Sequence, residues 1–432
     1  MTVRRWLPII GVLLQLGFQG GATAQMRGHG GPVRALAVAP GGGLAVSGGF
    51  DQAAILWTIE AGTALTVLRY HDGAVNAVAA LADGGFVTAS EDGRIALWRA
   101  GQAEPERVFS EHGGPVVGLA VSPDGLSLAS ASWDGTARIR PLAGGPARVL
   151  EGHQGNVNAV AFLPDGRFVT AGYDATVRIW PLPDDRDGAP VVRTLPTILN
   201  ALAVLPDGEI AAAGGDAIVR LMRPDGPVRA EIDVGPNPVI ALAPSPDGTR
   251  IAAATAGGAV AVIDRAQARI LHRLVGPGLP VWSVAWRPDG RELLTGGSDR
   301  LIRRWDARSG EPIGPLAMVR PVDPLAAWHG DRGAEVFRAC VACHALRPED
   351  SPRAGPSLAG VIGRRIATVS DYRYSDALKG MDIVWDARTI ARLFEVGPAR
   401  YTPGTRMPEQ TITSADDREA LVRFLERATA TP

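Results

Sequence analysis

The chain has 432 residues, more than one ordinary domain holds, and 46% of them are hydrophobic, which is enough to bury large cores. The formal net charge is −1, so electrostatics gives no reason to expect a nucleic-acid partner or an anionic membrane surface. Only two cysteines are present, which excludes a fold stapled by several disulfides.

The first 24 residues have the pattern of an export signal. Arg4 and Arg5 form a positive n-region, residues 6–18 form a short apolar run, and residues 22–24 have the A-x-A form of a cleavage site. The alternative is an uncleaved anchor, but the run is interrupted by proline and glycine and is short of the roughly 20 residues that a spanning helix needs. The pattern predicts export to the periplasm, cleavage after Ala24 and no stable membrane span in the mature chain.

Residues 26–318 repeat with a period of about 41 residues. Short stretches of alternating apolar residues predict strands, and Pro-Asp-Gly or Asp-Gly pairs predict the turns between them. Seven blocks are present, and they begin near His29, His71, His112, His153, Thr197, Gly235 and Gly276. A four-stranded unit of this length resembles the WD-repeat β-propeller, whose blades run about 40–45 residues. The resemblance implies an all-β, seven-bladed propeller over residues 25–318.

Two residue types recur at fixed places in the repeat. A histidine opens each of the first four units, and an aspartate precedes the third strand in six units, at Asp51, Asp92, Asp134, Asp174, Asp216 and Asp299. A ring of metal ligands or catalytic carboxylates is one interpretation, but one set per blade would not converge on a single substrate. The resemblance implies instead that each aspartate locks its blade through the histidine and a serine or threonine. Units five to seven lack the histidine, so we expect those blades to be held mainly by packing.

The last repeat leads into a proline-rich segment. Residues 311–319 can supply the outer strand of the last blade, so we expect each blade to come from one contiguous repeat. Pro315, Pro321 and Pro324 mark the end of regular strand and predict a stiff linker over residues 319–330.

From Asp331 onward the period of two gives way to helical spacing, which predicts a second, all-α domain over residues 331–432. A helix is expected from Asp331 to Cys340. The last helix begins at a capping-box-like pair, Ser414 and Asp417, and its apolar stripe consists of Leu421, Phe424, Leu425 and Ala428.

The run Cys340-Val341-Ala342-Cys343-His344 has the C-x-x-C-H spacing of a c-type haem attachment signal. Two thiols three positions apart can form thioethers to both vinyl groups of one porphyrin, and the histidine that follows is an axial iron ligand. A redox dithiol or half of a zinc site is the alternative for C-x-x-C, but the adjacent histidine and the lack of any further cysteine disfavour both. Thioether attachment is an exported-side chemistry in bacteria, in agreement with the signal segment. The motif therefore predicts one covalently attached haem c.

The sixth iron ligand has candidates in Met381, Met407 and the histidines outside the motif. Met407 lies in a Pro- and Gly-rich loop, residues 401–408, which can present one thioether sulfur in a defined position. Met381 lies near a turn and has the pattern of ordinary packing.

In this region the chain resembles class I cytochrome c of the mitochondrial and α-proteobacterial type, over nearly all of residues 331–430. The matching residues are Gly355-Pro356-Ser357-Leu358, Gly363-Arg364, Tyr374-Ser375-Asp376-Ala377, Trp385, Pro398 and Pro403-Gly404-Thr405-Arg406-Met407.

The resemblance implies a role for each matching site residue. Met407 would be the distal ligand opposite His344, and the carbonyl of Pro356 would accept the His344 ring N–H. The residues expected to contact the haem propionates are Arg364, Tyr374 and Trp385. Phe394 departs from the pattern, because the family often has a tyrosine there beside the methionine sulfur.

His/Met ligation saturates the iron, leaves no site for a substrate and suits one-electron transfer, and a methionine ligand raises the reduction potential. We therefore expect an electron carrier rather than an enzyme, with a dehydrogenase, quinol-linked complex, oxidase or second cytochrome as redox partner. The propeller would be a docking scaffold for a protein partner. Because Lys379 is the only lysine, docking would use arginines such as Arg338, Arg347, Arg400 and Arg406. Two alternatives remain: an oxidoreductase whose propeller holds a substrate or second cofactor, and an assembly protein whose haem senses redox state.

Overall fold

The computed structural model describes residues 25–102, 104–182, 188–314, 325–338, 340, 344–347, 355–370, 372, 374–405, 407 and 411–430. The expected signal segment, residues 319–324 of the linker, Cys343 and Arg406 lie outside the described residues. Within the described residues, no helix has the length and hydropathy needed to cross a membrane.

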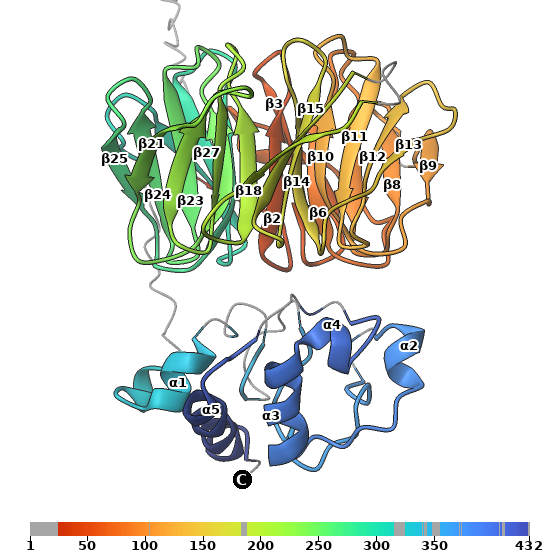
Figure 1. Ribbon diagram of the computed structural model, residues 1–432, viewed down its shortest axis with the longest axis vertical. Helices are drawn as coiled ribbons and strands as arrows, with labels where there is room; N and C mark the ends of the chain where they lie inside the picture. Colours follow the sequence, from red (N-terminus) through yellow and green to blue (C-terminus); the bar gives the residue numbers. More distant parts are fainter. Residues whose placement is uncertain are drawn as a thin grey trace, which may run out of the picture.

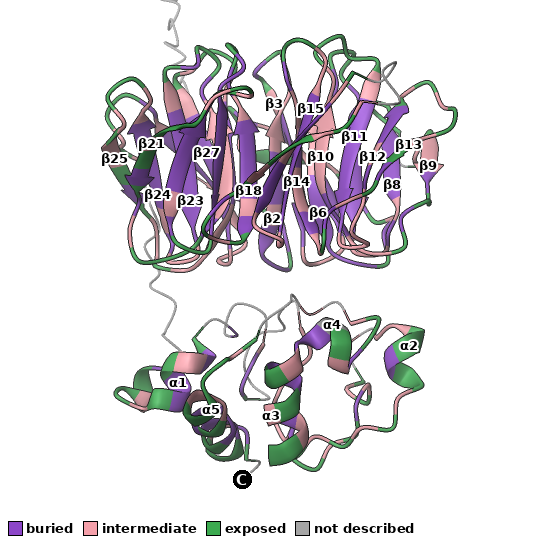
Figure 2. Cartoon of the chain, in the orientation of Figure 1, coloured by how far each residue is buried: buried purple, intermediate pink, exposed green. Residues whose placement is uncertain are grey.

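Seven four-stranded antiparallel sheets form the propeller that the repeat predicts (Figure 1). The innermost strands are β2 (Val33–Val38), β6 (Val75–Ala80), β10 (Val116–Val121), β14 (Val157–Phe162), β18 (Leu199–Val204), β22 (Val239–Pro244) and β26 (Val281–Trp286). Each contacts the innermost strands of both neighbouring blades, and β26 contacts β2, so the ring closes. Buried residues are concentrated in the strands, and exposed residues in the connecting turns (Figure 2).

The remaining strands complete the blades from the inside outward. The second strands are β3 (Leu44–Gly49), β7 (Phe86–Ser90), β11 (Ser127–Ser132), β15 (Phe168–Gly172), β19 (Ile210–Gly214), β23 (Arg250–Thr255) and β27 (Glu292–Gly297). The third strands are β4 (Ala54–Thr58), β8 (Ile95–Trp98), β12 (Ala137–Pro141), β16 (Thr176–Trp180), β20 (Ile218–Met222), β24 (Ala259–Asp264) and β28 (Leu301–Asp306). The outer strands are β5 (Thr63–Leu68), β9 (Arg107–Phe109), β13 (Arg148–Leu150), β17 (Val191–Thr194), β21 (Val228–Asp233), β25 (Arg269–Val275) and, in blade seven, β1 (Gln25–Arg27).

Blade seven takes its outer strand from the N-terminal side of the chain, because β1 pairs antiparallel with β28. The end of the last repeat adds only an isolated bridge between Pro312 and Trp305 on that edge. The expectation that every blade comes from one contiguous repeat is therefore wrong for blade seven. The reason lies in Met26, whose side chain is fully buried in a cluster with Trp57 and Ile302, so β1 contributes apolar burial between the last and first blades.

The recurrent polar residues hold individual blades together. In blade one Asp51 Oδ1 lies 3.0 Å from His29 Nδ1, and His29 Nε2 lies 2.7 Å from Ser47 Oγ, which also accepts a hydrogen bond of 2.8 Å from Trp57 Nε1. Equivalent histidine–aspartate contacts recur in blades two, three and four. Burial works against the charged form of Asp51, but the hydrogen bond and charge of His29 outweigh it, so the pKa of Asp51 is lowered.

Blades five and seven replace the missing histidine with an arginine on the third strand. Arg220 Nη2 lies 2.6 Å from Asp216 Oδ2, and Arg303 makes the same pair with Asp299. Both arginine side chains are almost completely buried. The expectation that these blades are held mainly by packing did not include this contact, in which an ion pair takes the place of the histidine contact.

Helices make up the C-terminal domain, which lies against one end of the propeller (Figure 1). They are η1 (Ala326–Trp328), α1 (Arg332–Phe337), α2 (Asp376–Lys379), α3 (Ala387–Val396), α4 (Pro398–Tyr401) and α5 (Ala415–Ala428). Helix α1 is thus shorter than the predicted 331–340. Leu325 and Trp328 pack into the same core as Phe337 and Phe424, so residues 325–330 belong to this domain rather than to the linker.

The packing of α1 on α5 positions the haem motif. Asp331 caps α1 by accepting a hydrogen bond from Ala334 N, and Ser414 caps α5 by accepting one from Asp417 N, as its sequence predicts. A Cβ on Gly333 would lie only 2.1 Å from the carbonyl oxygen of Ala420, so the two helices cross at close range there. This crossing fixes the end of α1 from which the chain continues to Cys340.

Candidate haem site

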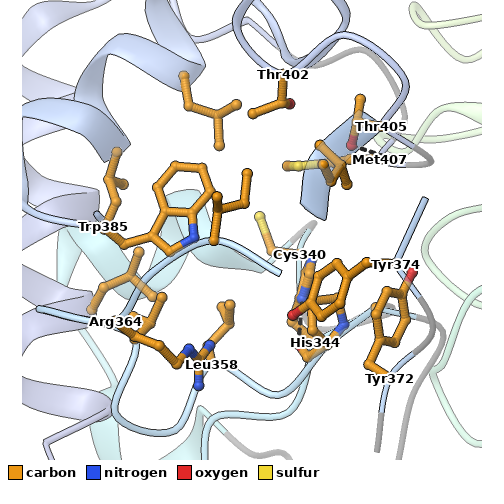
Figure 3. A pocket seen from close by; sticks show the side chains of 18 of the residues that line it. Cys340, His344, Leu358, Arg364, Tyr372, Tyr374, Trp385, Thr402, Thr405 and Met407 are labelled. Atoms are coloured by element: carbon orange, nitrogen blue, oxygen red, sulfur yellow. Dashed lines mark hydrogen bonds between the residues drawn. The ribbon is translucent and has the colours of Figure 1, made fainter. Parts of the chain in front are cut away.

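One cavity in the C-terminal domain brings together seven of the eight predicted site residues (Figure 3). They are Cys340, His344, Pro356, Arg364, Tyr374, Trp385 and Met407. Cys343 lies outside the described residues. Apolar side chains supply most of the remaining wall, among them Phe337, Leu358, Ile390, Leu393, Phe394 and Leu425.

The imidazole of His344 is held in place by the backbone. Its Nδ1 lies 2.9 Å from the carbonyl oxygen of Pro356, a distance at which the ring N–H donates a hydrogen bond. The backbone N–H of His344 donates to Cys340 O over 2.9 Å, which joins the histidine to the cysteine before it. Metal-ligating histidines commonly donate their second ring N–H to a backbone carbonyl, and this contact sets the ring orientation.

Met407 follows α4 in the chain and lines the same cavity as His344. Figure 3 shows the sulfur atoms of Met407 and Cys340 directed into the same space. The loop before the methionine is tight: Thr405 N donates to Thr402 O, and Met407 N donates to Thr405 Oγ1 over 3.1 Å. Gly404 has φ of 82°, and a Cβ on it would lie 2.7 Å from Ala377 Cβ, so glycine is required there.

Arg364 and Trp385 are positioned together. Trp385 N donates to Arg364 O over 2.9 Å, and Gly363 N donates to Trp385 O over 2.7 Å. The Arg364 guanidinium donates to two backbone carbonyls, those of Ala359 and Ser357, at 2.8 and 2.7 Å. Burial lowers the pKa of this arginine, although the nearby Tyr374 acts in the opposite direction. Among the described residues no carboxylate pairs with it, so the wall of the cavity carries a partly buried positive charge.

Comparison with known proteins agrees with this geometry. The family described as Cytochrome c matches residues 330–429, and the family described as WD domain, G-beta repeat matches residues 20–58, 62–99, 103–140, 144–181 and 268–306. Cytochrome c of Cochliobolus lunatus is 36% identical over 99 residues, which cover 23% of this chain and 91% of that protein. Cytochrome c of Arabidopsis thaliana is also 36% identical, over 23% of this chain and 88% of that protein. Cytochrome c2 of Rhodomicrobium vannielii is 31% identical over 25% of this chain and 86% of that protein.

The chain belongs to the cytochrome c family. Its cytochrome domain holds one covalently attached haem c and carries electrons through it, and this domain is fused to a WD-repeat propeller. The described residues of the cavity are suited to hold this haem. Cys340 places a buried thiol in the cavity, the walls are largely apolar, and Arg364 supplies a positive charge in the same wall.

Phe394 is buried in the wall of the cytochrome cavity that also contains Met407. Its backbone carbonyl accepts a hydrogen bond from Ile412 N over 2.8 Å, which ties α3 to the segment before α5. A phenylalanine offers no hydroxyl, so this position cannot donate a hydrogen bond to the methionine sulfur.

Two lining residues of the cytochrome cavity come from the propeller, and sequence reasoning missed them. Phe50 and Glu91 each stand directly before the locking aspartate of their blade, Asp51 and Asp92. The sequence shows that the two residues occupy equivalent positions in the repeat. Their proximity to His344 depends on how the two domains meet, which the repeat does not indicate. Among the described residues, no group of three or more His, Cys, Asp and Glu side chains could hold a metal ion.

Proposed function

We propose that this protein is a periplasmic c-type cytochrome that exchanges single electrons with protein partners, and that its propeller is the docking scaffold for one of them. The observation that carries the proposal is the meeting of His344, Met407 and Cys340 in one largely apolar cavity. The haem supplies the one-electron chemistry, and the chain's own residues hold and tune it.

Each site residue has a separate task in this proposal. Cys340 and Cys343 would form the thioethers, and His344 and Met407 would ligate the iron. Pro356 keeps the imidazole in one orientation through its carbonyl, 2.9 Å from Nδ1. With His344 and Met407 both as ligands, the iron would have no open position for a substrate, which favours electron transfer over catalysis at the iron.

The positive charge of Arg364 would compensate the negative charge of the haem propionates. Among the described residues, the partners of this guanidinium are two backbone carbonyls. A positive charge is costly to bury with neutral partners, and a carboxylate is its best partner. Tyr374 and Trp385 line the same cavity and would share the propionate contact.

The periplasmic location rests on residues 1–24 and on the exported-side chemistry of thioether formation. The docking role rests on the general use of WD propellers as protein-binding platforms and on arginines exposed on the cytochrome domain, at Arg338, Arg347 and Arg400. Tethering a partner near the haem would raise its effective concentration without any new contact at the haem itself.

Fractionation of expressing cells tests the location, and N-terminal sequencing of the haem-stained product tests the cleavage. The expected result is a periplasmic protein that starts at Gln25 and titrates as a single one-electron couple. A haem protein retained in the membrane fraction with an intact N-terminus would contradict the proposed location. A titration that needs two couples would contradict a carrier with one haem as its only redox group.

A further inference from the structure

The cavity of the cytochrome domain is not closed by that domain alone. Phe50 and Glu91, here called the rim, line it together with His344 and Met407. Figure 1 shows the cytochrome domain next to one end of the propeller. The rim residues line the cavity of that domain, so their turns lie at this end of the propeller. Both follow the second strand of their blade, β3 and β7 respectively.

The two rim residues occupy the same position in successive blades. Phe50 N donates to Pro32 O over 2.9 Å, and Glu91 N donates to Ala74 O over 3.0 Å. The next residue in each turn is the aspartate that contacts the blade's histidine, at 3.0 Å in blade one and 3.1 Å in blade two. These contacts make the rim a rigid part of the propeller rather than a mobile loop.

The rim is further stiffened around Phe50. Its ring meets that of Trp282 edge-on, with centroids 5.6 Å apart and an interplanar angle of 70°. The indole N–H of Trp282 donates to Ser298 Oγ over 2.7 Å, and the guanidinium of Arg34 lies 5.6 Å from the Trp282 ring. Blades seven and one therefore hold this aromatic side chain at the edge of the haem cavity.

We propose that the propeller completes the haem site: the rim docks on the opening of the cytochrome cavity, where Phe50 excludes water and Glu91 places a carboxylate near the haem. The partner of this propeller surface is thus the chain's own cytochrome domain. A redox protein cannot dock on that side of the opening while the rim is in place. This inference concerns the haem environment and stands apart from the proposed docking of other proteins.

The two rim residues should act on the reduction potential in opposite directions. Ferric haem carries one more positive charge than ferrous haem, so a nearby carboxylate stabilises the ferric form and lowers the potential. An apolar cover that excludes water disfavours the more charged ferric form and raises the potential.

The test is an equilibrium redox titration of full-length protein. Glu91→Gln should shift the midpoint potential upward, and Phe50→Ala should shift it downward, whereas Phe50→Leu keeps the cover and should titrate close to the wild type. The matched controls lie outside the cavity lining. Glu151→Gln makes the same charge change at an exposed residue, and Trp133→Phe changes the equivalent turn position of blade three. Neither should shift the potential.

Thermal unfolding by circular dichroism shows that each variant is folded, and Glu91→Gln decides the question alone if Phe50→Ala does not fold. The inference is overturned if folded Glu91→Gln and Phe50→Ala titrate at the wild-type potential, or if Glu151→Gln shifts it as much as Glu91→Gln. A one-electron couple that persists in all variants would leave the carrier function intact in either case, so the two proposals fail separately.

Discussion

Gly333 lies where α1, the helix before the haem motif, crosses α5, and a single methyl group there should loosen the cytochrome domain. A Cβ at this position would lie 2.1 Å from Ala420 O and 2.5 Å from Phe424 Cβ. Carbon atoms rarely approach within about 3 Å of such neighbours, so the helices must separate by roughly 1 Å. Overpacking of this kind costs about 1–3 kcal/mol. The better helix propensity of alanine offsets at most about 1 kcal/mol of that cost.

At the middle of the overpacking range the expected net loss is thus at least about 1 kcal/mol, which lowers the melting temperature of a domain of this size by roughly 4–8 °C or more. Thermal unfolding followed by haem absorbance measures the cytochrome domain separately from the propeller. Gly380→Ala is the matched control, because the atoms nearest to a Cβ there lie 3.6 Å away. If Gly333→Ala and Gly380→Ala both melt with the wild type, the close crossing of α1 and α5 is not a constraint and the reasoning fails.

Three further outcomes are expected. Arg303→Met removes a buried partner of the blade-seven aspartate and should cost about 1–3 kcal/mol in denaturant unfolding, whereas Arg308→Met, at an exposed position, should cost little. Burial lowers the pKa of His153, and the contact with His29 helps to lower the pKa of Asp51. As the pH falls, each group therefore takes up its proton in the unfolded chain before it does so in the folded chain. Propeller stability should fall below about pH 6.5, as histidine protonates, and again below about pH 4, as aspartate protonates. A urea midpoint that stays constant from pH 7 to pH 3 would disprove this linkage. Phe394→Tyr should raise the reduction potential by donating a hydrogen bond to the methionine sulfur, and a lowered potential would argue against that geometry.

Local patterns made most of the site predictable. The C-x-x-C-H run and the loop before Met407 each predict a role in haem binding from a few consecutive residues. This is possible because haem attachment and iron ligation depend on short spacings in the sequence. The seven repeats likewise predict seven blades, since each unit carries its own strands and turns. The Asp-x-x-x-Arg spacing in blades five and seven was equally visible, but its meaning depends on a missing histidine that the arginine replaces.

Contacts between distant segments were not predictable in the same way. Strand β1 is three residues long and has no periodicity, so its pairing with β28 depends on the burial of Met26 between two blades. Phe50 and Glu91 are ordinary turn residues in their own repeats, and only the meeting of the two domains places them at the cavity. Both features depend on tertiary packing, which no local spacing encodes.

Exposure of the reduced full-length protein to carbon monoxide tests most directly whether His344 and Met407 saturate the iron. We predict that the visible spectrum of the wild type stays unchanged, because His344 and Met407 would both ligate the iron. Met407→Ala should bind carbon monoxide and show the altered spectrum, which proves that the assay detects an open position. Ready binding of carbon monoxide by the wild type would contradict the assignment of this protein as an electron carrier with a closed iron.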